Sequence, residues 1–267
     1  MNARRVRCVR RRVLLVLIAT LALLGVGAVT AATASADPPA PPGTPTATSF
    51  AGTPLVGPLF FSGLDANHGC TASVLASPTR DLIITAAHCI EGTGAGVQFA
   101  PGYDRGATPY GVWTATEAYV DPGWVATQDP RRDYAILRVA GPVQDVTGGS
   151  LLGRAPRPGE RITDIAYNAG IDDQPIRCTV PSHLTDGFPS FNCHGYVGGS
   201  SGSPWLTYLP GTHAPVVHGV IGGLHQGGCF EYTSYSSPFD TAAYRLLLRA
   251  TLHLRPDTVP PAGSDGC

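Results

Sequence analysis

The chain has 267 residues, of which 43% are hydrophobic and only 14% are charged, and it contains 33 glycines and 25 prolines. A soluble protein usually carries about 25% charged residues, so this composition excludes a coiled coil or a highly charged disordered chain and favours a compact, turn-rich domain. Without residues 1–36 the chain keeps 12 arginines against 19 acidic residues, a formal charge of −7. Because phosphate binding requires clustered cations, nucleic acid and anionic membranes are excluded as expected partners.

Residues 1–36 have the organisation of a secretory signal. An arginine-rich start leads into an apolar run over residues 13–29, and the segment ends in Ala-Ser-Ala, which fits the A-x-A cleavage pattern. We therefore expect cleavage before Asp37 and a secreted protein without stable membrane association. The apolar run is close to the lower limit of length for a membrane span, so a retained membrane anchor is the alternative.

The remaining chain is predicted to be a folded domain between two irregular segments. Residues 37–54 are rich in proline, threonine and alanine, which indicates a flexible leader or short propeptide. Residues 55–254 form the predicted domain, and residues 255–267 form a turn-like tail that is mobile unless Cys267 is bridged. Short runs rich in Val, Ile, Thr and Tyr predict β-strands of a barrel or sandwich. These runs lie at residues 56–61, 71–76, 81–87, 96–100, 133–139, 161–167 and 216–224. Only residues 240–252, which open with an aspartate N-cap, predict a helix.

The cysteine count agrees with export. Six cysteines follow the signal: Cys70, Cys89, Cys178, Cys193, Cys229 and Cys267. They allow 15 pairings and up to three disulfides in an oxidising compartment. A metal site is the alternative, because His68, His88 and His194 each lie near a cysteine. Neither C-x-x-C nor H-E-x-x-H spacing occurs, so we expect no metal and no other cofactor.

Three short motifs carry the residue types of nucleophilic catalysis, in the order His, Asp, Ser. His88 lies in the sequence TAAHC, Asp133 opens DYAIL 45 residues later, and Ser201 lies in GGSSGSP. A serine hydroxyl attacks a carbonyl only when a base removes its proton, and histidine can do so near neutral pH. A carboxylate then orients the imidazole, and glycines let backbone N–H groups approach the developing oxyanion. Asp129 is a competitor for the role of the acid.

These motifs resemble those of the chymotrypsin-like (trypsin-fold) serine peptidases, over about residues 55–250. The ending Ser-Gly-Ser-Pro is most similar to the bacterial V8-like, or glutamyl endopeptidase-like, branch. The resemblance implies an all-β fold of two six-stranded antiparallel β-barrels with a C-terminal helix, and a site between the barrels. It implies a secreted, monomeric serine endopeptidase that acts on protein or peptide substrates.

The resemblance also implies a role for individual residues. His88 is the general base, Asp133 the orienting acid and Ser201 the nucleophile, and the N–H groups of Gly199 and Ser201 form the oxyanion hole. The implied disulfides are Cys70–Cys89 and Cys178–Cys193, and Cys229–Cys267 then follows by elimination. The implied substrate-binding residues are Gly195, Ile221, Gly222, Gly223 and His225.

Two features depart from the animal trypsins: Ser200, and the segment Gly222-Gly223-Leu224, where many relatives place a Ser-Trp-Gly-like strand against the substrate. Ser200 stands where trypsins carry an aspartate that pairs with a new N-terminus, so activation through that ion pair is not expected. Gly195, at the expected base of the specificity pocket, carries no charge, and an arginine or lysine there would be an unpaired buried cation. Ile221 lies where glutamyl-specific relatives carry a histidine. We therefore expect cleavage after neutral residues, with acidic residues as the second possibility through His225 or His218.

Two other functions remain open at this point. Gly198, Ser200 and Gly202 satisfy the G-x-S-x-G pattern of α/β-hydrolases, with Asp240 and His253 downstream as partners, which would make the protein an esterase. That pattern requires a helix after the serine, whereas a strand-like WLTYL follows here. The other alternative is an inactive, secreted protease-like binding module.

Overall fold

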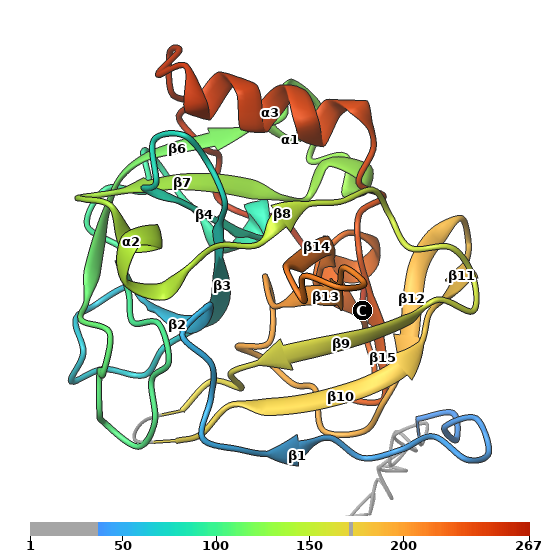
Figure 1. Ribbon diagram of the computed structural model, residues 1–267. Helices are drawn as coiled ribbons and strands as arrows, with labels where there is room; N and C mark the ends of the chain where they lie inside the picture. The colour runs from blue at the N-terminus through green and yellow to red at the C-terminus, as the bar shows by residue number, and fades with distance from the viewer. Residues whose placement is uncertain (1–36, 171–172) are drawn as a thin grey trace, which may run out of the picture. The chain divides into compact units, whose positions relative to one another are not determined.

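The computed structural model describes residues 37–170 and 173–267, so the predicted signal over residues 1–36 lies outside the described residues (Figure 1). The first half of this part is a closed barrel of antiparallel strands in the order β2-β3-β4-β7-β6-β5. Its strands are β2 (Val56–Phe60), β3 (Cys70–Leu75), β4 (Leu82–Thr85), β5 (Gln98–Phe99), β6 (Trp113–Val120) and β7 (Ala135–Val139).

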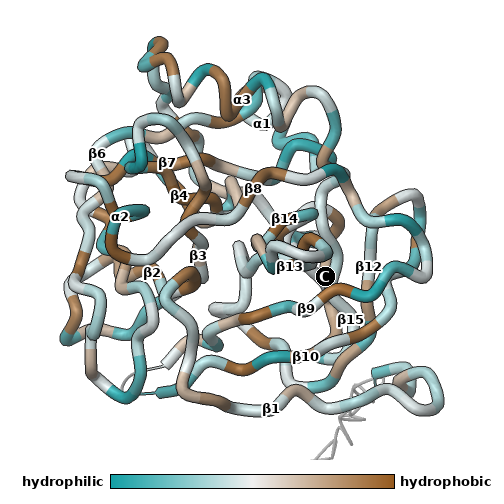
Figure 2. Tube along the Cα trace, viewed as in Figure 1, coloured by the Kyte–Doolittle hydropathy of each residue, from teal (hydrophilic) through white to brown (hydrophobic). Residues whose placement is uncertain are grey.

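Four strands of this barrel, β2, β3, β4 and β7, are buried on both faces. In β4, Ile83 packs inside the barrel, whereas its neighbour Ile84 packs into a second cluster that includes residues of the other half of the domain, such as Leu206. Alternate residues of a strand point to opposite faces, so a strand buried on both faces is mostly apolar, and the charged Arg138 of β7 is ion-paired. Figure 2 shows hydrophobic colour over most of β4.

The second half consists of two sheets. The larger sheet has the strand order β1-β10-β9-β13-β14-β8, and the smaller has the order β11-β12-β15. Their strands are β1 (Thr48–Ser49), β8 (Leu151–Leu152), β9 (Arg161–Ala166), β10 (Ile176–Pro181), β11 (His183–Thr185), β12 (Phe188–Asn192), β13 (Pro204–Tyr208), β14 (Pro215–Val220) and β15 (Thr233–Tyr235). A third core cluster, rich in aromatic residues, fills the space between the sheets and includes Phe191, Tyr196, Trp205 and Ile221.

The predicted all-β fold with a closed six-stranded barrel is confirmed. The second half differs from the first in that its hydrogen-bonded ladders do not close into one ring. The larger sheet gains β1 from the N-terminal segment and β8 by a parallel pairing with β14, and a single bridge from Ile221 to Ser236 links the two sheets.

The helices are short except for the last. They are α1 (Pro122–Thr127), α2 (Val143–Thr147) and α3 (Thr241–Thr251), with the 3-10 turns η1 (Ala87–Cys89), η2 (Pro130–Arg132) and η3 (Leu224–Gly227). The predicted C-terminal helix is confirmed, and the Asp240 side chain caps α3 by accepting from the Ala242 N–H at 2.7 Å. Helix α3 packs across β6 and β7 (Figure 1). No helix among the described residues is long and apolar enough to cross a membrane.

The two flanking segments are both held against the domain. Strand β1, in the segment expected to be flexible, pairs with β10. The Arg177 guanidinium stacks over the Phe50 ring, with 4.8 Å between Cζ and the ring centroid. Composition did not reveal this order, because backbone pairing to a sheet edge does not depend on apolar side chains. The tail was expected to be mobile unless Cys267 is bridged. Cys267 is bonded to Cys229, so the tail is attached to the domain.

Candidate active site

His88 lies in η1, at the point where the buried strand β4 leaves the first barrel. The next residue, Cys89, is bonded to Cys70 on the adjacent strand β3. The His88 side chain is 9% exposed. Strand and disulfide together fix the turn that carries the imidazole.

Asp133 is completely buried and binds the imidazole directly. Its carboxylate accepts hydrogen bonds from His88 Nδ1 at 2.8 Å, from the His88 backbone N–H at 2.9 Å and from the Gly223 N–H at 2.8 Å. Its own N–H donates to Ser237 Oγ at 3.0 Å. An ionised carboxylate can only accept, so Nδ1 carries the proton and a neutral His88 presents the lone pair of Nε2. This is the tautomer that a general base requires.

Asp129, the competing acid, has a different task. Its Oδ1 accepts from the Arg131 N–H at 2.9 Å and so caps η2, the turn that ends at Asp133. The structure brings Asp133 to His88 and leaves Asp129 in this turn.

Ser201 occupies the second position of a four-residue turn. The turn runs from Ser200 to Ser203 and is closed by a bond of 3.0 Å from the Ser203 N–H to the Ser200 carbonyl. Gly202, the third residue, has φ of +82°, the conformation that a type II turn needs at that position. We call residues 200–203 the nucleophile turn.

The nucleophile turn is pressed against the strands that lead to His88. A Cβ on Gly202 would lie 2.1 Å from Thr85 Oγ1 and 2.3 Å from the Thr71 carbonyl oxygen, so only glycine fits. The Thr71 N–H also donates to the Ser201 carbonyl at 2.7 Å. No hydrogen bond joins His88 Nε2 to Ser201 Oγ in the described part of the chain. Such bonds are often long before substrate binds.

Two backbone donors remain free beside Ser201. A Cβ on Gly199 would lie 2.0 Å from Ala169 N, and the Ala169 N–H donates to the Gly198 carbonyl at 2.6 Å. Because the C=O and N–H of a trans peptide point in opposite directions, this bond turns the Gly199 N–H away from Ala169. Neither the Gly199 nor the Ser201 N–H donates to another group among the described residues. Both are suited to bind an oxyanion.

The expected pocket residues fall into two groups. Gly195, the expected base, is held from behind, because its N–H donates to Glu231 at 2.6 Å and its carbonyl accepts from Asn168 Nδ2 at 2.8 Å. Ile221 is 3% exposed and accepts from the Gly202 N–H at 2.7 Å, so it supports the nucleophile turn. Neither Gly195 nor Ile221 has a charged side chain.

The other three expected substrate-binding residues follow in one segment. Gly222 and Gly223 are buried against Asp133, and a Cβ on Gly222 would lie 3.0 Å from its carboxylate. His225 has φ of +52°, and its Nδ1 lies 2.9 Å from the Asp265 carbonyl of the C-terminal tail. The tail therefore holds His225 in place.

All three predicted disulfides are present: Cys70–Cys89, Cys178–Cys193 and Cys229–Cys267. His88 and His225 each lie within 4.8 Å of both sulfurs of one bridge. In each case the two sulfurs are bonded to each other, so neither offers a thiolate to a metal. The other histidines considered as ligands bind carboxylates: His68 binds Asp173, and His194 binds Glu231.

The residues of the hydrolase alternative are not brought together as a site. Ser200 Oγ donates to the Val197 carbonyl at 2.8 Å, and Ser200 is followed by strand β13 rather than by a helix. Asp240 caps α3 and binds Arg132, and His253 is exposed beyond that helix. This arrangement does not fit a nucleophile elbow.

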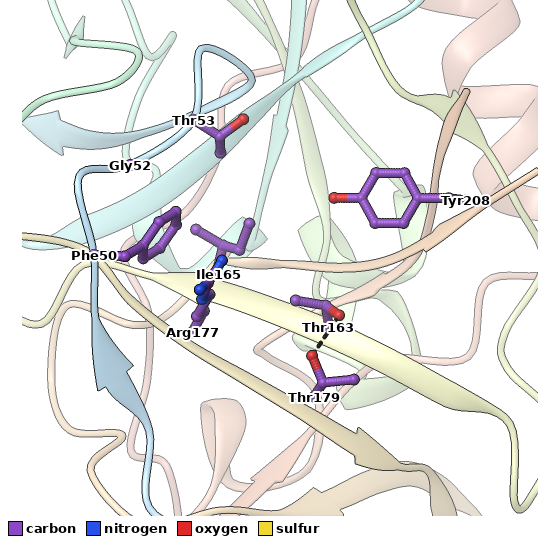
Figure 3. A pocket seen from close by; sticks show the side chains of 8 residues that line it. All are labelled: Phe50, Gly52, Thr53, Thr163, Ile165, Arg177, Thr179 and Tyr208. Atoms are coloured by element: carbon purple, nitrogen blue, oxygen red, sulfur yellow. Dashed lines mark hydrogen bonds between the residues drawn. The ribbon is translucent and has the colours of Figure 1, made fainter. Parts of the chain in front are cut away.

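A cavity of about 550 Å³ lies away from these groups (Figure 3). It opens between Phe50 of the N-terminal segment, Arg177 of β10 and Tyr208 of β13, above the hydrogen-bonded pair Thr163 and Thr179. None of the predicted site residues lines it.

Two supports of the acid are absent from the three motifs. The Gly223 N–H binds the Asp133 carboxylate, and Ser237 Oγ receives its N–H and donates to the Pro130 carbonyl. The only sequence signal for the Gly223 contact was the glycine pair that follows β14. The sequence predicts substrate binding for this pair instead. Ser237 carried no signal, because it lies 104 residues from Asp133 along the chain.

Comparisons with known proteins identify the family and the fold. The family model described as a trypsin-like peptidase domain matches residues 70–212, which include His88, Asp133 and Ser201. An extracellular metalloprotease of Bacillus subtilis (strain 168) is 27% identical over 92 residues, or 33% of this chain. The chain spans 28% of the length of that relative.

Solved structures share the fold. Protease Anisep from Arthrobacter nicotinovorans has a TM-score of 0.65 at 22% identity, covering 78% of this chain and 100% of its own. The thermostable serine protease AL20 from an extremophilic microorganism has a TM-score of 0.63 at 25% identity, covering 75% and 98%. A Glu endopeptidase has a TM-score of 0.61 at 17% identity, covering 79% and 98%. Since the family match covers more than half of the sequence, the chain belongs to the trypsin-like peptidases.

Proposed function

We propose that the mature protein is a secreted, monomeric serine endopeptidase that cleaves proteins or peptides through an acyl-enzyme on Ser201. One observation carries this proposal: the buried Asp133 holds His88 as a base, beside a turn that presents Ser201 and two unused N–H donors. The expected cleavage of the signal before Asp37 supports secretion. Metal ions and cofactors have no part in the proposed reaction.

The reaction follows from these positions. His88 Nε2 takes the proton of Ser201 as its oxygen attacks the carbonyl carbon of the scissile bond. The oxyanion accepts hydrogen bonds from the Gly199 and Ser201 N–H groups, and Asp133 stabilises the imidazolium. His88 then gives its proton to the leaving amine. Water, activated by the same imidazole, hydrolyses the acyl-enzyme and restores Ser201.

A fluorophosphonate probe tests the proposed nucleophile. Such a probe phosphonylates an activated serine, so the purified secreted protein is expected to carry one label, and peptide mapping should place it on Ser201. Denatured protein is the control, because it keeps every serine but loses the triad. A label on Ser200 would support the esterase alternative, and the absence of any label would support the inactive binding module.

The expected specificity is for a neutral residue before the scissile bond. Gly195 has no side chain, and Ile221 places an apolar side chain where a carboxylate would need a partner. The Glu231 carboxylate, which contacts the Gly195 N–H, is already paired with His194, so an ionic side chain in this pocket would lose hydration without gaining a free counter-charge. A digest of a denatured proteome, analysed by mass spectrometry, should show cleavage chiefly after apolar or small neutral residues. Cleavage after Glu or Asp would assign recognition to His225, and cleavage after Arg would contradict the assigned pocket.

A further inference from the structure

A buried acid lies directly behind the nucleophile turn. Asp164 is the fourth of the six residues of β9 and is 0% exposed. Ile162 and Ala166 lie on the same face of this strand, and both belong to the aromatic-rich core cluster of the second half. Asp164 is paired with Cys178 of β10 on one side and with Trp205 of β13 on the other. A carboxyl group at this place has apolar neighbours on every adjacent strand.

The carboxyl group binds the last residue of the nucleophile turn. Ser203 Oγ lies 3.0 Å from one oxygen of Asp164 and 2.9 Å from the other. The Ser203 N–H closes the turn onto Ser200, and its carbonyl accepts from the Ile221 N–H at 3.0 Å. Every hydrogen-bonding group of Ser203 is thus committed, and its side chain is committed to Asp164. Because Ser201 lies two residues away in the same turn, Asp164 fixes the segment that aims the nucleophile.

A second bond connects Asp164 to the segment that enters the site. Tyr196 is 4% exposed, and its hydroxyl donates to the Asp164 carbonyl oxygen at 3.5 Å. Tyr196 follows Gly195, the expected base of the pocket. Asp164 therefore contacts the chain both before and after the oxyanion-binding residues.

No cation among the residues that the structure describes balances this acid. The described groups that reach Asp164 are Ser203 and Tyr196, and of these only Tyr196 titrates. Its other partners on β10, β13 and the neighbouring core are a disulfide sulfur, an indole and apolar side chains. An isolated carboxylate among such neighbours would be strongly unfavourable, and proteins avoid it by keeping the acid protonated.

We propose that Asp164 is a positioning residue, a neutral carboxylic acid that holds Ser203 and the nucleophile turn, and that its ionisation at alkaline pH disrupts this support. The neutral acid donates its O–H to Ser203 Oγ and accepts the Ser203 hydrogen on its other oxygen. Loss of the proton leaves a charge with one hydroxyl partner in an apolar core. The proposal rests on the function proposed above, because it assigns Asp164 to the geometry of Ser201.

The direction of the titration follows from burial. Burial raises the pKa of Asp164 well above its ordinary value of 3.8, and the hydrogen bonds from Ser203 and Tyr196 oppose that rise without cancelling it. The folded protein thus binds a proton that the unfolded chain has released above about pH 4. The contribution of the protonated Asp164 to the free energy of unfolding is fully present below the pKa of this side chain in the unfolded chain. It is lost as pH rises through the pKa of Asp164 in the folded protein.

The charge state can be measured without activity. At pH 7, Asp164→Asn should leave the electrophoretic mobility of the native protein unchanged, because the wild-type side chain is already neutral. Asp186→Asn is the matched control: it removes an exposed carboxylate in the turn between β11 and β12, so its mobility should shift by one charge. An equal shift in both variants would show that Asp164 is ionised and would overturn the proposal.

The positioning role is tested by activity and its pH profile. Asp164→Ala should lower kcat/KM about 100-fold, as expected for a reacting group misplaced by about 1 Å. Asp164→Asn should recover at least about tenfold of this loss, because a neutral amide can both donate to and accept from Ser203 Oγ. The same variant should retain activity at alkaline pH values where wild type declines. An Asn variant as impaired as the Ala variant, or an unchanged alkaline limb, would contradict the proposal.

Thermal unfolding covers the case in which Asp164→Ala does not fold. The melting temperature of Asp164→Asn relative to wild type should increase with pH above about 4, because only wild type must take up a proton to fold. A pH-independent difference would count against the neutral acid. Fluorophosphonate labelling of Ser201 separates the two proposals: if wild type is not labelled, the proposed function fails, whereas the mobility and unfolding results still decide the state of Asp164.

Discussion

Ser201→Ala is expected to lower kcat by about a millionfold while leaving the fold intact. Removing the nucleophile of a serine protease causes a loss of about this size, because the general base and the orienting acid then have no hydroxyl to activate. The Ser201 side chain accepts or donates no hydrogen bond among the described residues, so its removal leaves no partner unpaired. Initial rates on a peptide substrate and the melting temperature measure the two expectations.

Ser200→Ala is the matched control for this prediction. Ser200 Oγ donates to the Val197 carbonyl, so the variant should lose about 1 kcal/mol of stability and keep its turnover. Full activity of Ser201→Ala, or a millionfold loss in Ser200→Ala, would show that Ser201 is not the nucleophile. The two serines are neighbours in one turn, and only their environments distinguish them.

Five of the six strands of the first barrel lie in or overlap the predicted runs, whereas β6 was not singled out. The runs at residues 56–61, 81–87 and 133–139 contain β2, β4 and β7, since a strand buried on both faces is mostly apolar, as β7 is apart from the ion-paired Arg138. The predicted helix matches α3 because its cap and its end lie within the helix sequence itself. Strand β12 was not singled out, because its sequence FPSFN contains a proline and two polar residues although four of its five residues are buried.

The site was predictable only in part for a related reason. His88, Asp133 and Ser201 each lie in a short motif, and their order along the chain is the basis of the roles proposed for them. Their supports come from distant segments: Asp164 reaches Ser203 over 39 residues, and Gly223 reaches Asp133 over 90. Nothing in the sequence near Asp164 distinguishes a buried neutral acid from an exposed strand residue. Such pairs depend on how strands are arranged, which residue types alone do not specify.

The flanking segments show the same limit. Proline-rich composition predicted a flexible leader over residues 37–54, yet the backbone of this segment pairs with the loop before the nucleophile turn. The Ala47 N–H donates to the His194 carbonyl at 2.9 Å, and the His194 N–H donates to the Pro45 carbonyl at 2.8 Å. Backbone groups pair wherever a sheet edge offers partners, whatever their side chains. Composition therefore predicted too little order here.

Asp133→Asn is expected to lower kcat by about ten-thousandfold. The same isosteric replacement of the acid causes a loss of this size in a well-studied Ser-His-Asp triad. The buried carboxylate accepts from His88 N, His88 Nδ1 and Gly223 N, and an amide can accept only on its oxygen. If the amide NH₂ faces His88 Nδ1, the imidazole must accept there and carry its proton on Nε2. It then cannot take the proton of Ser201.

The position of the acid makes this prediction sharp, because a second aspartate lies four residues away. Asp129→Asn keeps an oxygen acceptor for the Arg131 N–H, so the cap of η2 should survive and turnover should remain close to that of wild type. Rates of both variants, with melting temperatures to verify folding, measure the difference. A loss confined to Asp129→Asn would assign the acid to Asp129. Equal losses would indicate that η2 as a whole, rather than the Asp133 carboxylate, sets the tautomer of His88.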